Sequence, residues 1–235
     1  MDQQRSNIAT LHGERFLVTG ALGCIGAWSL RHLVRAGAGV VATDLSTEPT
    51  RPRLIMSPEE LEQVSFQRLD VTDLAALRHC VEQERITRII HLAGVLIPGC
   101  IANPPLGARV NVEGTVNVLE TVRRSNGAVR GVSYASSLAV LGTADLYPER
   151  PIADDVLLRP HTLYGTYKMA AEHAARLYWE TWQVASIGLR PSVVYGVGRD
   201  TGLTSDATKA IVAAVAGRPF QFSFSGGLGM QYAPD

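Results

Sequence analysis

The sequence is poor in the features that mark several large classes of protein. Its 235 residues include three cysteines, Cys24, Cys80 and Cys100, which are too few and too widely spaced for a disulfide framework or a zinc site. No apolar run reaches the roughly 18 residues that a membrane helix needs. The polar first residues also lack the apolar core of a signal peptide. We therefore expect a cytoplasmic protein without a metal centre and without a membrane partner.

A surplus of charge of either sign is also missing. Lysine and arginine together number 22, as do aspartate and glutamate, so the formal net charge is zero. Proteins that bind nucleic acids or membrane surfaces through general electrostatics need an excess of positive charge. The sequence thus predicts neither partner. Hydrophobic residues make up 46% of the chain, which is enough for a sizeable core, so we expect a globular protein that acts on a small molecule.

Apolar runs of strand length alternate along the chain with segments of helical periodicity. Strands are predicted at 15–19, 40–43, 64–69, 88–92, 132–135 and 186–189, and helices at 25–36, 73–84, 106–125 and 163–182. This alternation predicts an α/β fold, a Rossmann-type doubly wound parallel sheet with helices on both faces. We assign residues 14–190 to this domain and residues 191–235 to the start of a substrate-binding subdomain. The long connections 94–105 and 141–161 are candidate substrate walls.

Three glycines follow the first predicted strand in a G-x-x-G-x-x-G turn. Gly20 permits the tight turn, Gly23 lets the backbone approach a pyrophosphate, and Gly26 lets the helix pack closely on the strand. The helix that follows offers unpaired N–H groups to phosphates. Asp44 ends the second strand, where a carboxylate accepts hydrogen bonds from a ribose hydroxyl and repels a 2′-phosphate. Together these features predict a site for NAD rather than NADP.

Two further strand ends supply candidate cofactor contacts. Asp70 and Val71 follow the third strand, where the adenine would lie, although Asp70 is equally consistent with a helix cap. The fourth strand ends in His91-Leu92-Ala93-Gly94, whose small residues let the backbone meet a cofactor. We predict cofactor contacts at Asp70, Val71, Leu92, Ala93 and Gly94.

A tyrosine and a lysine near the start of the last predicted helix form the candidate catalytic pair. Tyr164 and Lys168 are four residues apart and share one helix face. A free phenol has a pKa near ~10, and an adjacent ammonium and a nicotinamide cation would both lower it. Lys168 could also hold the nicotinamide ribose. Ser136 and Ser137 end the fifth strand, where Ser137 could orient a substrate oxygen, or where both could be a merely polar strand end.

The combined motifs resemble a known family, the extended short-chain dehydrogenases of the NAD-dependent epimerase/dehydratase type. The matching segments, in the family's order, are TGALGCIG, Asp44, Asp70-Val71, HLAG, VNVEGTVNVLE, YASSLAVLG, YGTYK and LRPSVVYGVG. The resemblance implies that Ser137, Tyr164 and Lys168 are catalytic and that Asn111 supports the site. It implies cofactor contacts at Cys24, Ile25, Pro191 and Val194, and a homodimer formed through helices 106–125 and 163–182.

The chain also departs from the family's pattern. Leu138 and Ala139 follow Ser137, where dehydratases of this family carry an acidic residue, so we do not expect dehydration. Leu141 stands where a tyrosine often lines the sugar pocket. In the family, more residues complete a substrate domain after the point equivalent to Asp235, so we expect the 191–235 region to be truncated.

These features predict an NAD-dependent oxidoreductase or epimerase that acts on a secondary alcohol of a sugar or nucleotide sugar, with a tyrosine base. An alternative is a dehydrogenase of a small sugar acid or of threonine, since SSLAVLG and MQYAPD resemble the threonine-dehydrogenase-like branch. A non-catalytic NAD-binding sensor is the alternative from another class.

Overall fold

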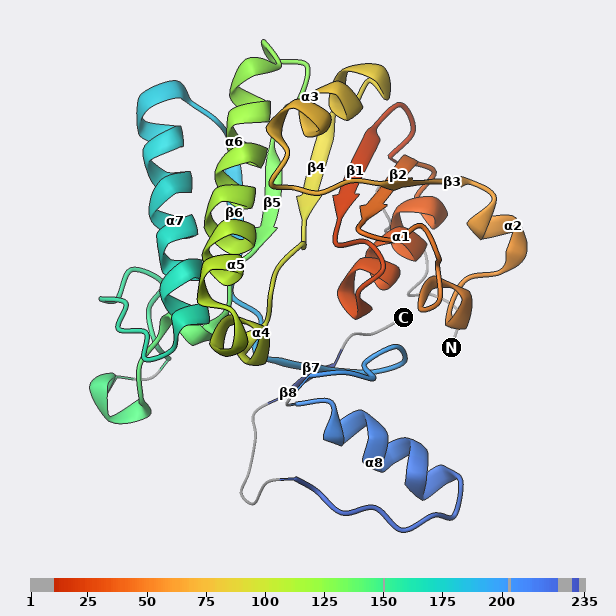
Figure 1. The fold of residues 1–235 in the computed structure, drawn as a ribbon, viewed down its shortest axis with the longest axis vertical. Helices are drawn as coiled ribbons and strands as arrows, with labels where there is room; N and C mark the ends of the chain where they lie inside the picture. The colour runs from red at the N-terminus through yellow and green to blue at the C-terminus, as the bar shows by residue number, and fades with distance from the viewer. Residues whose placement is uncertain (1–10, 150, 203, 224–229, 233–235) are drawn as a thin grey trace.

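The computed structural model describes residues 11–149, 151–202, 204–223 and 230–232. Six parallel strands form one sheet in the order β3-β2-β1-β4-β5-β6 (Figure 1). They are β1 (Arg15–Thr19), β2 (Gly39–Asp44), β3 (Val64–Arg68), β4 (Arg88–His91), β5 (Val132–Ala135) and β6 (Ser186–Leu189). The order reverses between β1 and β4, and such a switch point is where ligands bind in open α/β sheets.

Helices follow most of the strands. The α-helices are α1 (Cys24–Arg35), α2 (Pro58–Leu61), α3 (Leu74–Gln83), α4 (Ile97–Ala102), α5 (Pro104–Ala108), α6 (Gly114–Arg124), α7 (Leu163–Trp182) and α8 (Asp206–Val215). A π-helical turn, Arg109–Glu113, joins α5 to α6. Short 3₁₀ turns lie at Pro52–Leu54, Leu138–Val140 and Ala144–Leu146. None of the helices in the described ranges is long and apolar enough to cross a membrane.

Side-chain alternation along β1 divides the core into two layers. Phe16 and Val18 pack on one face of the sheet with apolar side chains of α1, among them Leu30, Leu33 and Val34. Leu17 points to the other face and packs with side chains of α3, α6 and α7, among them Leu77, Val118 and Ala175. Neighbouring residues of a strand point to opposite faces, so both layers follow from one apolar run. The predicted doubly wound fold is confirmed.

The β6 edge of the sheet is only partly covered by other elements. Ile187 and Leu189 of β6 are 63% and 60% exposed. A separate pair of strands, β7 (Val193–Tyr195) and β8 (Met230–Tyr232), lies with α8 beyond the carboxyl ends of the sheet strands (Figure 1). The predicted boundary between a cofactor domain and a substrate subdomain near residue 190 stays a prediction.

The predicted strands and helices agree with the structure to within about two residues, with two exceptions. The helix expected over 106–125 is three joined segments that begin at Pro104. The connection 94–105, expected to be a loop, contains α4 and the start of α5. Both short helices carry proline in their first turn, where the missing N–H costs nothing. Proline therefore starts these two helices within the connection that was expected to be a loop.

Candidate active site

The glycine turn connects β1 to α1 at the switch point of the sheet. Gly20 has a φ of +67°, and a Cβ there would lie 2.6 Å from the Ala93 nitrogen, so only glycine lets the ends of β1 and β4 meet. A Cβ on Gly26 would lie 2.5 Å from the Gly20 oxygen, so α1 packs directly on the turn. A Cβ on Gly23 would meet only the Gly20 oxygen, at 3.3 Å, because Gly23 borders a cavity.

This first cavity has a volume of about 820 Å³, within the range of ligand sites. No side chain caps the N-terminus of α1, and its first turn contains no acidic residue. The amino end of this helix therefore presents positive partial charge to the cavity, as a phosphate group requires. The predicted cofactor contacts that line this cavity are Gly20, Gly23, Cys24, Ile25, Gly26, Asp44, Asp70, Val71, Leu92, Ala93, Gly94, Tyr164 and Pro191.

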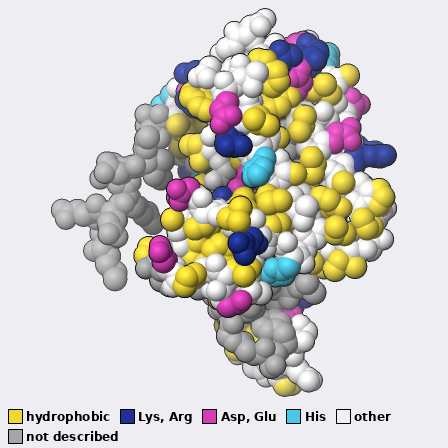
Figure 2. Space-filling view, turned by 90° about the vertical axis from the view of Figure 1, so that its left-hand side faces the viewer, with side chains coloured by type: hydrophobic (Ala, Val, Ile, Leu, Met, Phe, Trp, Pro, Cys, Tyr) yellow, Lys and Arg dark blue, Asp and Glu magenta, His cyan; other side chains and the backbone are white. Residues whose placement is uncertain are grey.

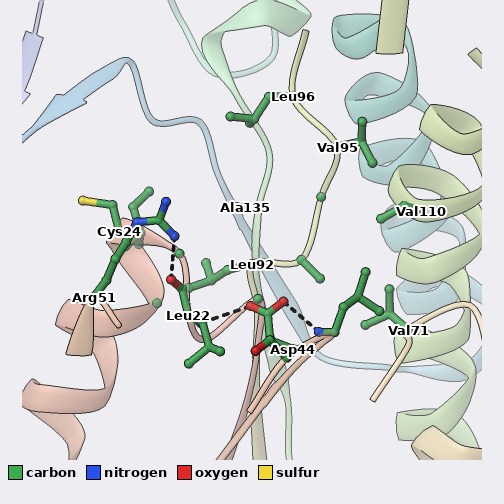
Figure 3. A pocket seen from close by; sticks show the side chains of 18 of the residues that line it. Leu22, Cys24, Asp44, Arg51, Val71, Leu92, Val95, Leu96, Val110 and Ala135 are labelled. Atoms are coloured by element: carbon green, nitrogen blue, oxygen red, sulfur yellow. Dashed lines mark hydrogen bonds between the residues drawn. The ribbon is translucent and has the colours of Figure 1, made fainter. Parts of the chain in front are cut away.

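Asp44 is held at the cavity wall by backbone groups. Its Oδ2 accepts a hydrogen bond from the Leu22 N–H at 3.1 Å and its Oδ1 accepts one from the Leu45 N–H at 2.8 Å (Figure 3). Arg51, which the sequence analysis missed, donates to the Leu22 carbonyl at 2.9 Å and pairs with Asp200 at 2.8 Å. Arg51 lies in the loop after β2 without any motif around it, so only the structure places it here.

Asp70 lines the cavity and does not cap a helix. Its Oδ1 accepts hydrogen bonds from the N–H and the hydroxyl of Thr72, both at 2.9 Å, and it lines the cavity. Helix α3 is capped by Asp73, which accepts a hydrogen bond from the Ala76 N–H. The alternative interpretation of Asp70 as the cap of α3 is therefore wrong.

Ser137 and Tyr164 meet where α7 begins. The two side chains lie close enough for the Ser137 hydroxyl to stabilise the charged form of the Tyr164 phenol. Burial raises the pKa of the Tyr164 phenol, and the Ser137 hydroxyl and the positive charge of Arg199 oppose this rise. The sequence analysis expected the Lys168 ammonium to lower this pKa, but Lys168 is not among the groups that shift it.

Lys168 lies behind the site wall. Its Nζ donates to the Ala135 carbonyl at 2.8 Å and lies 5.7 Å from the centre of the Tyr164 ring. Burial lowers the pKa of Lys168 to about 8, because desolvation disfavours an ammonium. The Lys168 ammonium, which was expected to assist Tyr164, is thus itself destabilised, and it is directed at a backbone carbonyl.

The two serines after β5 face different partners. Ser136 is buried and donates to Glu172, whose carboxylate also binds Arg190 through two hydrogen bonds of 2.9 and 2.7 Å. Ser137 lies beside Tyr164 and accepts a hydrogen bond from the Ala139 N–H at 3.1 Å. Successive residues of an extended chain point to opposite sides, so only Ser137 reaches the tyrosine.

Asn111 is a buried residue of the π-helical turn and lines neither cavity described here. Its amide donates to the Val95 carbonyl at 2.9 Å and accepts from the Val95 N–H at 3.2 Å. A Cβ on Gly94 would lie 2.8 Å from the Asn111 Oδ1 and 3.5 Å from the Lys168 Nζ. Asn111 and Lys168 therefore support the segment after β4 from behind, and their contact with a cofactor stays a prediction. π-turns of this kind are frequent at functional sites.

A second cavity, of about 310 Å³, adjoins the first. Tyr164, Pro191 and Arg199 line both cavities. Ser137 and Val194 line only the second one, so the predicted cofactor contact Val194 lies on this side. The connection 94–105 contributes Leu96, Ile97 and Pro98 to its wall, whereas the connection 141–161 contributes none of its lining residues. Only one of the two candidate substrate walls therefore borders it.

Backbone contact fixes the start of α7 against the turn that carries Ser137. A Cβ on Gly165 would lie 2.1 Å from the Ala139 oxygen. The Thr162 hydroxyl caps the helix by accepting a hydrogen bond from the Gly165 N–H at 3.0 Å. Tyr164 and Ser137 therefore sit on two backbone segments that touch with no side chain between them.

This fold and this site define a class of protein, the dinucleotide-binding α/β proteins with serine, tyrosine and lysine at the carboxyl end of the sheet. The sequence model of the NAD dependent epimerase/dehydratase family matches residues 16–227. The chain belongs to this family, whose cofactor is NAD. The described residues fit that cofactor, since Gly23 leaves room at the α1 N-terminus and Asp44 places a carboxylate at the cavity wall.

Similar proteins include both epimerases and dehydrogenases. UDP-glucose 4-epimerase from Mycolicibacterium smegmatis is 30% identical over 204 residues, which are 85% of this chain and 63% of that protein. The structure of L-threonine dehydrogenase from Clostridium difficile has a TM-score of 0.79 and 26% identity, covering 94% of this chain and 67% of that one. UDP-glucose 4-epimerase from Brucella ovis, in complex with NAD, has a TM-score of 0.66 and 25% identity, covering 80% and 54%. The chain thus spans under two thirds of the length of the first relative.

Proposed function

We propose that the chain carries the cofactor-binding and catalytic half of an NAD-dependent oxidoreductase or epimerase that acts on a secondary alcohol of a sugar or nucleotide sugar. The observation that supports this most is the position of Tyr164. It lines both the cavity over the glycine turn and the adjoining smaller cavity, and Ser137 lines the smaller cavity beside it. A group at this junction can contact a cofactor and a substrate together.

In this proposal Tyr164 accepts the proton of the substrate hydroxyl, and the Ser137 hydroxyl hydrogen-bonds the same oxygen. Bound NAD supplies the acceptor for the hydride from the carbon. Release of the ketone gives a dehydrogenase, and return of the hydride to the other face of the ketone gives an epimerase. Because burial raises the pKa of Tyr164, we expect turnover to increase as the pH rises above neutrality.

A dehydrogenase of a small sugar acid or of threonine is the second candidate. The cavity beside Ser137 has about 310 Å³, near the lower end of the range for small-molecule sites. The similarity to L-threonine dehydrogenase also favours it. We further propose a cytoplasmic homodimer formed through α5, α6 and α7, with the region from residue 191 beginning the substrate subdomain.

The test is the Tyr164→Phe variant, assayed with nucleotide sugars, sugar acids and threonine for NADH formation and for epimerised product. Loss of the base should lower turnover by about 10²–10⁴-fold and leave the Kd for NAD within about twofold, a change of under half a kcal/mol. Tyr167→Phe is the matched control, because Tyr167 lies on the same helix and donates to the Pro104 carbonyl instead.

Near-normal turnover in Tyr164→Phe contradicts the proposed mechanism. Tight NAD binding by the unaltered protein, without turnover of any of these substrates, favours the sensor instead. NADH accumulation identifies a dehydrogenase, and interconversion without NADH release identifies an epimerase.

A further inference from the structure

Arg199 lies at the junction of the two cavities. It lines both of them, and among the described residues that line the smaller cavity it is the one charged side chain. Its positive charge also acts to lower the pKa of Tyr164, so it lies within electrostatic range of the phenol. A fixed cation therefore borders the place where the proposed reaction occurs.

Arg199 has little to bind within the described part of the chain. A guanidinium carries five N–H donors, and here one of them, on Nη2, meets the Thr204 hydroxyl at 3.0 Å. Its Nε is buried without a hydrogen-bond partner, and no carboxylate in the described ranges pairs with it. Its neighbour Asp200 is bound to Arg51. A partly buried cation without an anion is costly, which is typical of a group that awaits a charged ligand.

Resting on the second candidate function, the dehydrogenase of a small acid, we propose that Arg199 binds a carboxylate of the substrate, which is therefore a hydroxy acid whose acid group lies close to the carbon that is oxidised. The planar guanidinium fits a carboxylate with two parallel hydrogen bonds. Ser137 and Tyr164 then hold the hydroxyl oxygen while Arg199 holds the acid group within the same small cavity. Its role is to position the substrate and to select its class.

The cofactor's pyrophosphate is the rival ligand for Arg199, because this side chain also borders the first cavity. That cavity already has an anion site in the uncapped N-terminus of α1 and the open approach at Gly23. The smaller cavity has no other cation among its lining residues. The smaller cavity therefore depends on Arg199 for positive charge, and the first cavity does not.

The experiment measures binding to the NAD-saturated protein by calorimetry, with three probes that share one carbon skeleton. Glycerate carries the carboxylate beside a secondary alcohol, glyceramide replaces the acid by a neutral amide, and glycerol 3-phosphate replaces it by a phosphate. The variants are Arg199→Gln and Arg199→Lys. The control is Arg176→Gln, which alters an exposed arginine of α7 that pairs with Glu180.

We expect the unaltered protein to bind glycerate at least about tenfold more tightly than glyceramide, as a charge-assisted hydrogen bond implies. Arg199→Gln should abolish this preference, Arg199→Lys should retain part of it, and Arg176→Gln should retain all of it. The Kd for NAD should change by less than about twofold, well under 1 kcal/mol.

Three results overturn the proposal. They are equal binding of acid and amide by the unaltered protein, an acid preference that survives in Arg199→Gln, and tighter binding of glycerol 3-phosphate than of glycerate. A weakened affinity for NAD with an unchanged acid preference would assign Arg199 to the pyrophosphate. These binding readouts do not depend on Tyr164 as a base, so the proposed function and this inference fail separately.

Discussion

Asp44 accepts hydrogen bonds from two backbone N–H groups at the end of β2, and the sequence analysis predicts that its charge favours NAD. We expect Asp44→Ser to shift preference from NAD toward NADP, because the repulsion of a 2′-phosphate is removed. The measurement is the ratio of the two dissociation constants. Asp70→Asn is the control, since Asp70 lines the same cavity after a different strand, and its ratio should not change. A preference for NADP in the unaltered protein would show that Asp44 does not have this role.

His91 is a second residue whose charge state matters. It is buried between the hydroxyls of Thr19, at 2.7 Å, and Thr115, at 3.2 Å, and burial together with the charge of Lys168 lowers its pKa to about 3. In the unfolded chain His91 binds a proton near pH ~6.5, whereas in the folded chain it stays neutral at that pH. The contribution of His91 to stability is therefore complete above that pH and is lost as the pH falls toward 3.

We expect the free energy of unfolding to fall by about 1.4 kcal/mol per pH unit below pH ~6 through this group. In His91→Gln the part of this pH dependence that comes from His91 should vanish, while the part that comes from carboxylates remains. Urea titrations at several pH values between 7 and 4 measure the free energy of unfolding of the unaltered protein and of the variant. Parallel slopes for the two proteins would show that His91 titrates normally in the folded chain.

At the scale of elements, the segment after β7 is held by hydrogen bonds and an ion pair beside the first cavity. The Trp28 indole of α1 donates to the Val197 carbonyl at 3.0 Å, and Arg51 from the loop after β2 pairs with Asp200. Two distant parts of the nucleotide-binding half therefore hold the segment that carries Arg199. This arrangement predicts that the segment limits how fast the cofactor leaves.

We expect Arg51→Gln to release NADH about fivefold faster, because a partly exposed ion pair contributes about 1 kcal/mol. Arg53→Gln is the matched control, because Arg53 lies in the same loop, pairs with Glu48 and does not line the cavity. Stopped-flow displacement of NADH measures both rates. An equal release rate in the two variants would mean that the ion pair to Asp200 does not retain the cofactor.

The elements that the sequence predicts well are those whose own periodicity defines them. β1, β5, β6 and α7 have the predicted bounds, because each is an apolar run or a helical stripe bounded by turn residues. The π-helical turn at Arg109–Glu113 cannot be predicted in this way, since its residues have ordinary helical periodicity. Helix α8 was not predicted either.

The residues of the candidate site also fall into two groups, those that local sequence motifs indicate and those that only the fold brings to the cavities. The glycine turn, Asp44, Ser137 and Tyr164 belong to local motifs, so the sequence alone indicates them. Arg51 and Arg199 come from irregular connections, and they reach the cavities only because distant segments fold together. The shift of the Tyr164 pKa depends on burial, which no spacing in the sequence reports.

At the scale of the whole molecule, the face formed by α6 and α7 fits the proposed dimer. Figure 2 looks at the side of the molecule where α7 lies and shows hydrophobic side chains spread over it between scattered charged ones. Leu177 of α7 is 51% exposed, and Trp179 and Trp182 are also exposed. These exposed apolar side chains gather at the carboxyl end of α7, and contact with a second subunit would cover them.

We expect the unaltered protein to sediment as a dimer and Leu177→Arg to sediment as a monomer, because a buried charge without a partner opposes association. Leu157→Arg is the control, since Leu157 is 68% exposed and lies in the connection 141–161, outside the two helices of the proposed interface. Sedimentation velocity over a range of concentrations gives the mass of each. A monomeric unaltered protein would exclude the proposed dimer.

Gly165 bears on any attempt to make this protein resist heat. Replacing a helical glycine by alanine is a standard way to stabilise a protein, since alanine favours the helix and restricts the unfolded chain. Here the added methyl group would lie 2.1 Å from the Ala139 oxygen and would drive the start of α7 away from the turn that carries Ser137. Rules based on helix propensity would select this substitution first. The engineer who followed them would separate the serine from the tyrosine, so position 165 should be held fixed in any library designed for thermostability.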